Sequence, residues 1–171
     1  MLKTLGCLAA ALLVSVCTLH AATFDVVVGQ KPATTIVIPD EPLPVVTAAA
    51  EELQYHVRKA TSAELPIVRE AAAPAGPGHL YLGPCRATGK LGLKLAELQP
   101  NAFVMRSVGG NLYLVGDDSP GDVFWILHGN RTRVGTLFLS TSFWRNNSAS
   151  AGCGPGPSVK SYPHSRAFVC R

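Results

Sequence analysis

Apolar residues follow two patterns along the first two thirds of the chain, short β-type runs and one long helical stripe. The β-type runs are rich in Val, Ile, Leu and aromatic residues and lie at 24–28, 34–38, 65–68, 79–82, 102–106 and 111–115. The stripe recurs at three- and four-residue spacing and consists of Ala49, Leu53, Val57 and Ala60. Six short strands and one clear helix predict an α+β fold, one small mixed β-sheet with one or two helices packed on one face.

Signals at the element ends refine this prediction. Thr47 is a suitable N-cap for the helix, which places Glu51 and Glu52 near its positive end. The runs 24–28 and 34–38 are close enough along the chain to pair as a hairpin or meander. Gly109-Gly110 predicts a hairpin between the last two runs, and 91–98 is a candidate second helix.

The first residues have the pattern of an export signal. Lys3 supplies a positive charge, and residues 5–16 are an apolar run of 12 residues. Leu19-His20-Ala21 or His20-Ala21-Ala22 then offers a small residue for cleavage. This run is shorter than the roughly 20 residues that span a bilayer. We therefore expect a signal peptide at 1–21, a secreted or periplasmic protein, and no membrane attachment after cleavage.

Charge is divided unevenly along the 171 residues. Residues 22–122 hold eight Lys/Arg and eleven Asp/Glu, a net of −3, whereas 123–171 hold six Lys/Arg and no acid, a net of +6. The basic residues stand singly among Ser, Gly and Pro, so we expect no nucleic-acid partner. The length is also too small for a (β/α)₈ barrel, which needs at least about 200 residues.

One glycine-rich loop resembles a phosphate-binding loop only superficially. Residues 83–91 follow a strand and end in Gly89-Lys90-Leu91. The spacing is one residue too long, and Leu91 stands where a hydroxyl would bind Mg²⁺. The sequence favours a plain turn here and predicts no cofactor.

Acidic, histidine and cysteine residues are the candidates for catalytic or metal-binding groups. Glycoside hydrolysis needs two carboxyl groups at a fixed separation, but the acidic pairs Asp40-Glu41, Glu51-Glu52 and Asp117-Asp118 fit turns or a helix start. The histidines His56, His79, His128 and His164 lack a metalloprotease spacing. After export three cysteines remain, Cys85, Cys153 and Cys170, an odd number that leaves one thiol unpaired or intermolecular.

A metal site from Cys153, His164 and Cys170 has irregular spacing and no predicted element to hold it. We therefore predict no catalytic, cofactor-binding or metal-binding residue in this chain.

The order of the elements is similar to that of a known domain. The residues concerned include 49–57 (Ala-Ala-Glu-Glu-Leu-Gln-Tyr-His-Val), 59–67, Leu80-Tyr81-Leu82-Gly83, 111–116 and Gly135-Thr136-Leu137-Phe138. Over about 24–138 the chain resembles the N-terminal, β-hexosaminidase-like domain of bacterial α-glucuronidase-type glycoside hydrolases. This domain precedes the catalytic barrel of those enzymes.

The resemblance implies a non-catalytic accessory domain at 22–138. It also implies the missing barrel as partner, a polysaccharide as the parent's substrate, and no activity for this chain alone. Two other functions stay open: a stand-alone carbohydrate-binding or adhesion module, and an independent small hydrolase. A binding module needs aromatics exposed on one face, and between 22 and 122 the candidates are Phe24, Tyr55, Tyr81, Phe103 and Tyr113.

The resemblance stops after Phe138. The family continues with a helix close to Ala-Val-Tyr-Glu-Phe-Leu-Glu and then Gly-Val-Arg-Trp-Leu-Trp-Pro-Gly, which residues 139–156 do not match. If each codon's third base is joined to the first two bases of the next, 140–145 can encode Tyr-Glu-Phe-Leu-Glu and 149–156 can encode Val-Arg-Trp-Leu-Trp-Pro-Gly. We therefore predict that 139–171 are an out-of-frame, unstructured tail.

Overall fold

Strands composed almost wholly of apolar residues form the middle of the sheet. The structure, a computed structural model, describes residues 24–123, 132–148 and 168–169. The central strands β3 (Thr35–Ile38), β5 (His79–Leu82) and β7 (Asn111–Gly116) run parallel. Parallel strands are covered on both faces, which suits such runs.

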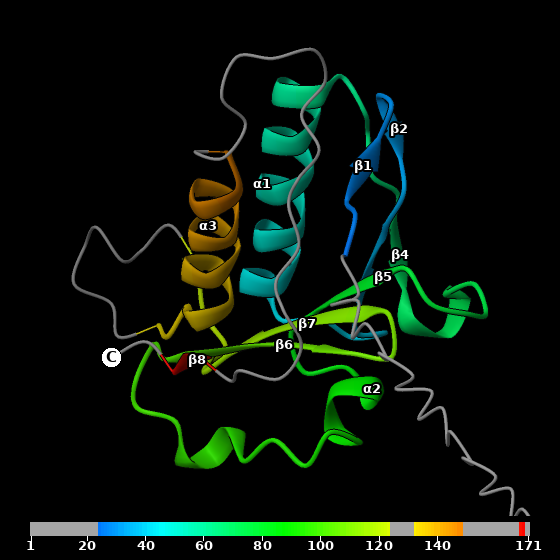
Figure 1. Cartoon of the computed structure of the whole chain (residues 1–171). Helices are drawn as coiled ribbons and strands as arrows, with labels where there is room; N and C mark the ends of the chain where they lie inside the picture. Colours follow the sequence, from blue (N-terminus) through cyan, green and yellow to red (C-terminus); the bar gives the residue numbers. More distant parts are fainter. Residues whose placement is uncertain (1–23, 124–131, 149–167, 170–171) are drawn as a thin grey trace, which may run out of the picture.

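Shorter or more polar strands occupy the margins of the sheet. β4 (Ile67–Arg69) pairs parallel to β3, while β6 (Phe103–Val108) is antiparallel to β7 and to β8 (Phe168–Val169). The strand order is β4-β3-β5-β7-β6-β8 (Figure 1). The sheet is mixed, and the predicted α+β class is confirmed.

Helix α1 (Pro44–Thr61) is the predicted amphipathic helix, but it begins earlier than Thr47. Leu43 is the N-cap residue in extended conformation and Pro44 opens the first turn, where its missing N–H costs nothing. Val45 and Val46 are fully buried, so the sheet contact extends the helix backward. Glu51 and Glu52 therefore lie outside the first turn, and their predicted role at the positive helix end is wrong.

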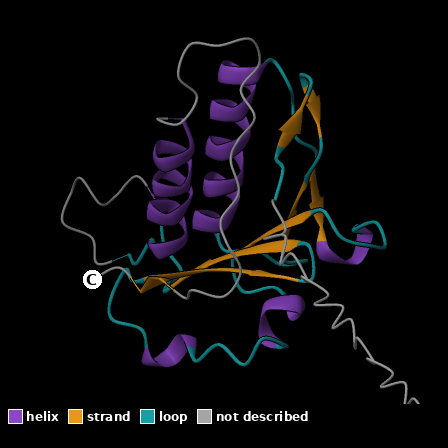
Figure 2. Cartoon of the chain, in the orientation of Figure 1, coloured by secondary structure: helices purple, strands orange, loops and turns teal. Residues whose placement is uncertain are grey.

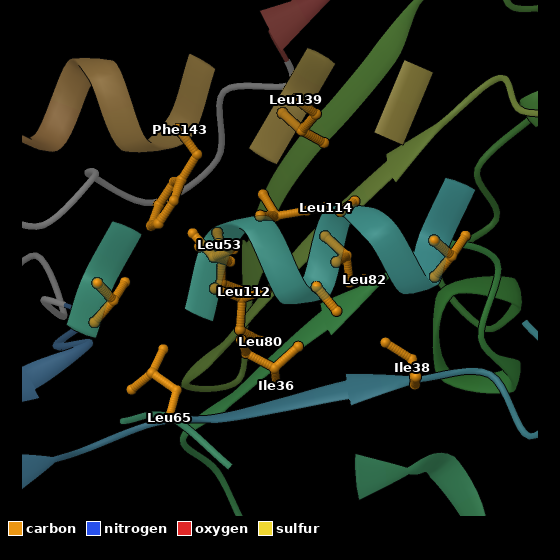
Figure 3. Close-up of a cluster of buried hydrophobic side chains, with 14 of the residues drawn as sticks. Ile36, Ile38, Leu53, Leu65, Leu80, Leu82, Leu112, Leu114, Leu139 and Phe143 are labelled. Atoms are coloured by element: carbon orange, nitrogen blue, oxygen red, sulfur yellow. The ribbon is translucent and has the colours of Figure 1, made fainter. Parts of the chain in front are cut away.

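A second helix, α3 (Gly135–Ser148), lies beside α1 on the same face of the sheet (Figures 1 and 2). Leu139 and Phe143 are buried there with Leu53 and Leu114 in one cluster (Figure 3). The prediction that 139–171 are unstructured is wrong for 139–148, because Leu139 and Phe143 provide enough apolar surface to fix a helix against α1 and β7. It is also wrong for 168–169, which pair with β6 as strand β8. Residues 149–167 and 170–171, like the predicted signal peptide, lie outside the described residues.

The opposite face of the sheet is covered by the connection between β5 and β6 (Figure 1). It contains a one-turn helix, α2 (Arg86–Gly89), and a 3-10 turn, η2 (Leu95–Glu97). The sequence predicted one helix over 91–98, and only that 3-10 turn forms within it. A second 3-10 turn, η1 (Glu70–Ala72), follows β4.

The predicted pairing of runs 24–28 and 34–38 is wrong. β1 (Val27–Val28) pairs instead with β2 (Lys31–Pro32), across a tight turn in which Gly29 and Gln30 both have positive φ. Such a turn matches the twist of a hairpin. It leaves the buried run Ile36–Ile38 free to enter the main sheet as β3. The predicted hairpin at Gly109-Gly110 is confirmed.

Candidate functional site

Charged side chains gather at the carboxyl edge of the parallel strands. Asp40 follows β3, Glu70 follows β4 and Arg86 follows β5, while Asp117 and Asp118 follow β7. Parallel strands end at the same edge, where open α/β sheets commonly bind ligands. This edge is therefore the first place to look for chemistry.

Asp40, Glu70 and Arg86 form one network. The Arg86 guanidinium donates from Nη2 to Asp40 Oδ2 at 3.0 Å and from Nε to Glu70 Oε2 at 3.2 Å. Asp40 Oδ1 also accepts from the Ala71 N–H at 2.7 Å. The Glu70 hydrogen bond and the Asp40 charge raise the pKa of Arg86 above its ordinary value. The network thus links the segments that follow three strands.

Glu70 also occupies the start of the loop that resembles a phosphate-binding loop. Its carboxylate accepts from the backbone N–H of Arg86 at 2.7 Å and of Ala87 at 2.8 Å, the first N–H groups of α2. These are the groups that would otherwise bind a phosphate. The loop contains the one-turn helix α2 rather than a plain turn, and the carboxylate of Glu70 accepts from the N–H groups at its start.

Gly83 lets that loop lie close to α1. Its φ is +80°, and a Cβ there would come within 2.8 Å of a Val46 methyl. Glycine therefore serves packing at this position, and the motif's first glycine requires no ligand to explain it.

Cys85 is a buried thiol behind the network. It is 3% exposed, and its Sγ lies 3.8 Å from the Val37 carbonyl oxygen. Burial, followed by the carboxylates of Glu70 and Asp40, raises the pKa of Cys85 to about 12. A thiol held neutral reacts poorly as a nucleophile, so Cys85 is a core residue. Cys153 and Cys170 lie outside the described residues.

The second cluster at this edge joins β7 to α3. Asp118 accepts from the Thr136 N–H at 2.9 Å through Oδ1 and from the Thr136 hydroxyl through Oδ2. The same hydroxyl accepts from the Gly116 N–H at 2.9 Å. Burial raises the pKa of Asp118 above its ordinary value, against the two Thr136 hydrogen bonds, which lower it.

Two glycines allow this join to be so tight. A Cβ on Gly116 would lie 2.1 Å from Thr136 N, and one on Gly135 would lie 2.5 Å from the Ala102 carbonyl oxygen. Each glycine thus faces backbone, which cannot swing aside as a flexible side chain can. We call Gly116, Asp118, Gly135 and Thr136 the β7–α3 join. The sequence predicts a turn at Asp117-Asp118 and carries no signal for the partner of Asp118, Thr136, which lies 18 residues further on.

The remaining predicted candidates do not converge. Glu51 and Glu52 are exposed on α1, with Glu52 2.9 Å from His56 Nε2. His79 is buried, and its Nε2 lies 2.8 Å from the Pro74 carbonyl oxygen, while Nδ1 has no hydrogen-bond partner within the described part of the chain. His128 and His164 lie outside it. Among residues 24–123 and 132–148, no three His, Cys, Asp or Glu side chains are placed to hold a metal ion.

The aromatic residues lie on different surfaces. Tyr81 and Tyr113 stack with ring centroids 4.9 Å apart on the sheet face away from α1, and Tyr113 is 8% exposed. Phe24 and Phe103 pack against the core. Tyr55 is exposed on α1, with Lys59 Nζ 5.6 Å from its ring centroid. They form no continuous exposed platform in the described residues.

Comparison with known proteins gives distant similarity to solved structures. No family model and no curated protein matches the chain. Among solved structures, a family GH115 4-O-methyl-α-glucuronidase with specificity for decorated arabinogalactans has 15% sequence identity and a TM-score of 0.46. The match covers 80% of this chain and 17% of that enzyme. None of the helices within the described residues has the length and apolar character needed to cross a membrane.

Proposed function

We propose that residues 22–138 are a non-catalytic accessory domain of a secreted glycoside hydrolase of the α-glucuronidase type. Its partner is the catalytic barrel of the full-length parent, and the parent acts on polysaccharide. Residues from about 139 onward are an out-of-frame reading of the parent gene. This chain by itself is inactive.

The observation that carries the proposal is the structural use of the residues behind the sequence resemblance. The Leu53 and Val57 positions of the 49–57 motif are buried against the sheet. Gly135 and Thr136 of the Gly-Thr-Leu-Phe motif form the β7–α3 join. The residues of both motifs therefore pack two helices against one sheet. Such a structural role is the one expected of a non-catalytic accessory domain.

The charged residues at the carboxyl edge support the same role. Glu70 accepts from two backbone N–H groups, Asp40 from one and Asp118 from one. A carboxylate whose oxygens accept hydrogen bonds from backbone N–H groups in this way has a structural role in holding the loops. The arrangement favours an accessory role over an independent small hydrolase.

The codon argument supports the out-of-frame tail. A shifted frame can encode Val-Arg-Trp-Leu-Trp-Pro-Gly over 149–156, and this is the continuation that the resemblance implies. The first two bases of most codons are nearly fixed by the amino acid, so this agreement has little freedom. It also accounts for the lack of any acidic residue over 139–171.

Reading the gene across the codons for 130–171 and beyond tests the proposal. We expect a shifted frame that runs without a stop into a barrel-sized open frame. A restored full-length protein should then release glucuronic acid from a decorated polysaccharide, and the present chain should not. A stop after Arg171 without any downstream frame would overturn the proposal.

The carbohydrate-binding alternative has its own test. Tyr81 and Tyr113 share one sheet face with Arg106, which lies in register with Tyr113. Binding of the present chain to a panel of soluble oligosaccharides, lost in Tyr81→Ala, would favour a stand-alone module. No binding across the panel would leave the accessory role.

A further inference from the structure

His79 is a buried titratable side chain outside both clusters at the carboxyl edge of the sheet. It opens β5 and lies on the sheet face away from α1, as Tyr81 does two residues later. The His79 side chain is 4% exposed. It contacts the connection from β4 to β5, whose residues 73–78 we call the β4–β5 strap.

The β4–β5 strap runs back along β3 and makes few contacts of its own. It follows η1, where the Ala71 N–H donates to Asp40, just beyond the end of β3. It ends at Gly78, whose carbonyl oxygen accepts from the Thr35 N–H at the start of β3 at 3.2 Å. Its middle residues, 74–77, are exposed and consist of Pro-Ala-Gly-Pro. Little buried apolar surface therefore holds the strap closed, and such segments open locally at low cost.

One side-chain hydrogen bond holds the middle of the strap. His79 Nε2 lies 2.8 Å from the Pro74 carbonyl oxygen. A carbonyl oxygen only accepts, so Nε2 carries the proton of the neutral ring and Nδ1 carries a lone pair. Within the described part of the chain Nδ1 has no hydrogen-bond partner, and no other hydrogen bond reaches residues 74–77. The closed strap thus contains the neutral imidazole.

A protonated ring does not fit this arrangement. The second proton would go to Nδ1 and make it a buried donor on a charged ring. A buried charge without a partner is strongly disfavoured. The ring reaches water when the strap lifts from it, and that exposure removes the cost. Proton uptake by His79 and opening of the strap are therefore coupled.

The groups around His79 offer no counter-charge for that proton. Its neighbours are Thr35 on β3, Asn111 on β7 and Tyr81 on β5, whose ring centroid lies 5.9 Å away. The strap itself holds no charged residue. Burial, followed by the charge of Tyr113, raises the pKa of Tyr81 above its ordinary value. The Tyr81 phenol therefore stays neutral from acid to neutral pH.

Charged groups further along this part of the sheet already have partners. Glu70, at the start of the connection, accepts from the Arg86 guanidinium, as Asp40 does. Arg106 donates from Nη1 to the Leu91 carbonyl oxygen at 3.2 Å. Neither carboxylate is therefore available to stabilise a protonated His79 in the closed strap.

We propose that protonation of His79 opens the β4–β5 strap. The neutral imidazole holds residues 73–78 closed through Pro74, and the protonated imidazole releases them. Opening uncovers the His79 ring and the neighbouring edge of Tyr81, which stacks on Tyr113. All these groups lie before residue 139, so the pH response is independent of the reading frame of the tail.

Amide hydrogen exchange of the full chain at about pH 7.5 and about pH 5.0 tests the proposal. The reporting amides are those of Thr35 and Gly78, which bond to Gly78 O and Gly110 O. A histidine in water takes up a proton below about pH 6.5, so an opening that admits the proton is populated roughly 30-fold more at the lower pH. We expect the protection factors of both amides to fall by that factor.

Two variants at position 79 sharpen the result. His79→Gln places an amide N–H near the position of Nε2 and does not titrate in this range, so protection should be the same at both pH values. His79→Phe keeps a ring but cannot donate to Pro74, so protection should be low already at the higher pH and show no pH dependence. Every carboxylate remains in both variants, so carboxylate titration affects all three chains alike.

Two outcomes would overturn the proposal. One is an unchanged protection of Thr35 and Gly78 between the two pH values, or an equal fall in His79→Gln. The other concerns the size of the opening. Local opening of the strap exposes little surface, so exchange at Gly78 should depend only weakly on added urea. A urea dependence as steep as that of the Leu53 amide in α1 would mean global unfolding instead of strap opening.

Discussion

Two clusters hold the carboxyl edge of this sheet, and they do so by different means. The Asp40–Glu70–Arg86 network lies at the surface, where the Arg86 side chain is 68% exposed. The β7–α3 join is mostly backbone against backbone, with Thr136 fully buried. Exposed ion pairs contribute little, whereas close approach of buried backbone tolerates no added atom. The join is therefore the point where the fold is most sensitive.

The largest effect is expected for Gly135→Ala. The added Cβ would lie 2.5 Å from the Ala102 carbonyl oxygen and 2.7 Å from Asp117 N. Relieving these contacts separates α3 from β7, so we expect a loss of about 3–5 kcal/mol in unfolding free energy or failure to fold. Gly89→Ala is the matched control, because a Cβ there meets nothing within 4 Å. Urea unfolding measures the unfolding free energy of both variants. Equal values for Gly135→Ala and Gly89→Ala would contradict the role of the join.

Thr136→Val should have the next largest effect. It keeps the shape of the side chain but removes the hydroxyl that serves both Gly116 and Asp118. Leaving a buried N–H and a buried carboxylate without this partner should cost about 2–3 kcal/mol. Thr141→Val, which loses a half-buried hydroxyl bonded to Leu137 O in the same helix, should cost much less. Comparable losses in the two variants would argue against a special position for Thr136.

The acid dependence of stability tests Asp118. Its pKa is raised in the folded chain by burial, so the folded state binds a proton more tightly than the unfolded state. Its contribution is then fully present below the unfolded pKa of 3.8 and is lost as pH rises through the raised folded value. Asp118→Asn should therefore gain stability relative to the unchanged chain as pH rises from acid to neutral. A pH series at constant ionic strength measures this, and an opposite trend would refute it.

Arg86→Met should have the smallest effect. The substitution keeps the aliphatic stem and removes the exposed guanidinium, while Glu70 still accepts from the Arg86 and Ala87 backbone positions. We expect the thermal midpoint to fall by less than about 2 °C. The difference should shrink further in high salt. A large, salt-independent loss would place the surface network on a level with the β7–α3 join.

Sequence patterns predicted the elements that depend on neighbouring residues. The α1 stripe, β5 and the hairpin at Gly109-Gly110 follow from spacing and turn chemistry within a few residues. Helix ends and strand partners depended on distant contacts. α1 begins at Pro44 because Val45 and Val46 are buried against the sheet. β3 does not pair with Val27–Val28, because a tight turn pairs that strand with Lys31–Pro32 instead.

The site was harder to predict than the fold. Glu70 and Arg86 are 16 residues apart, and Asp118 and Thr136 are 18 apart. Nothing local to any of them indicates its partner. Gly116 and Gly135 carry no recognisable turn signal either, because their requirement is contact with backbone brought from elsewhere. The sequence resemblance flagged Gly135-Thr136 as a motif, and the structure supplies its physical reason.

The position of α3 also sets the order in which the chain can fold. Leu139 and Phe143 complete the cover over a sheet whose main strands all come earlier in the sequence. Synthesis proceeds from the N-terminus, and domains fold as units once their chain is available. Until α3 emerges, Leu53 and Leu114 lack part of their cover. We therefore expect the sheet and α1 to complete their packing only when the chain has been made as far as Phe143.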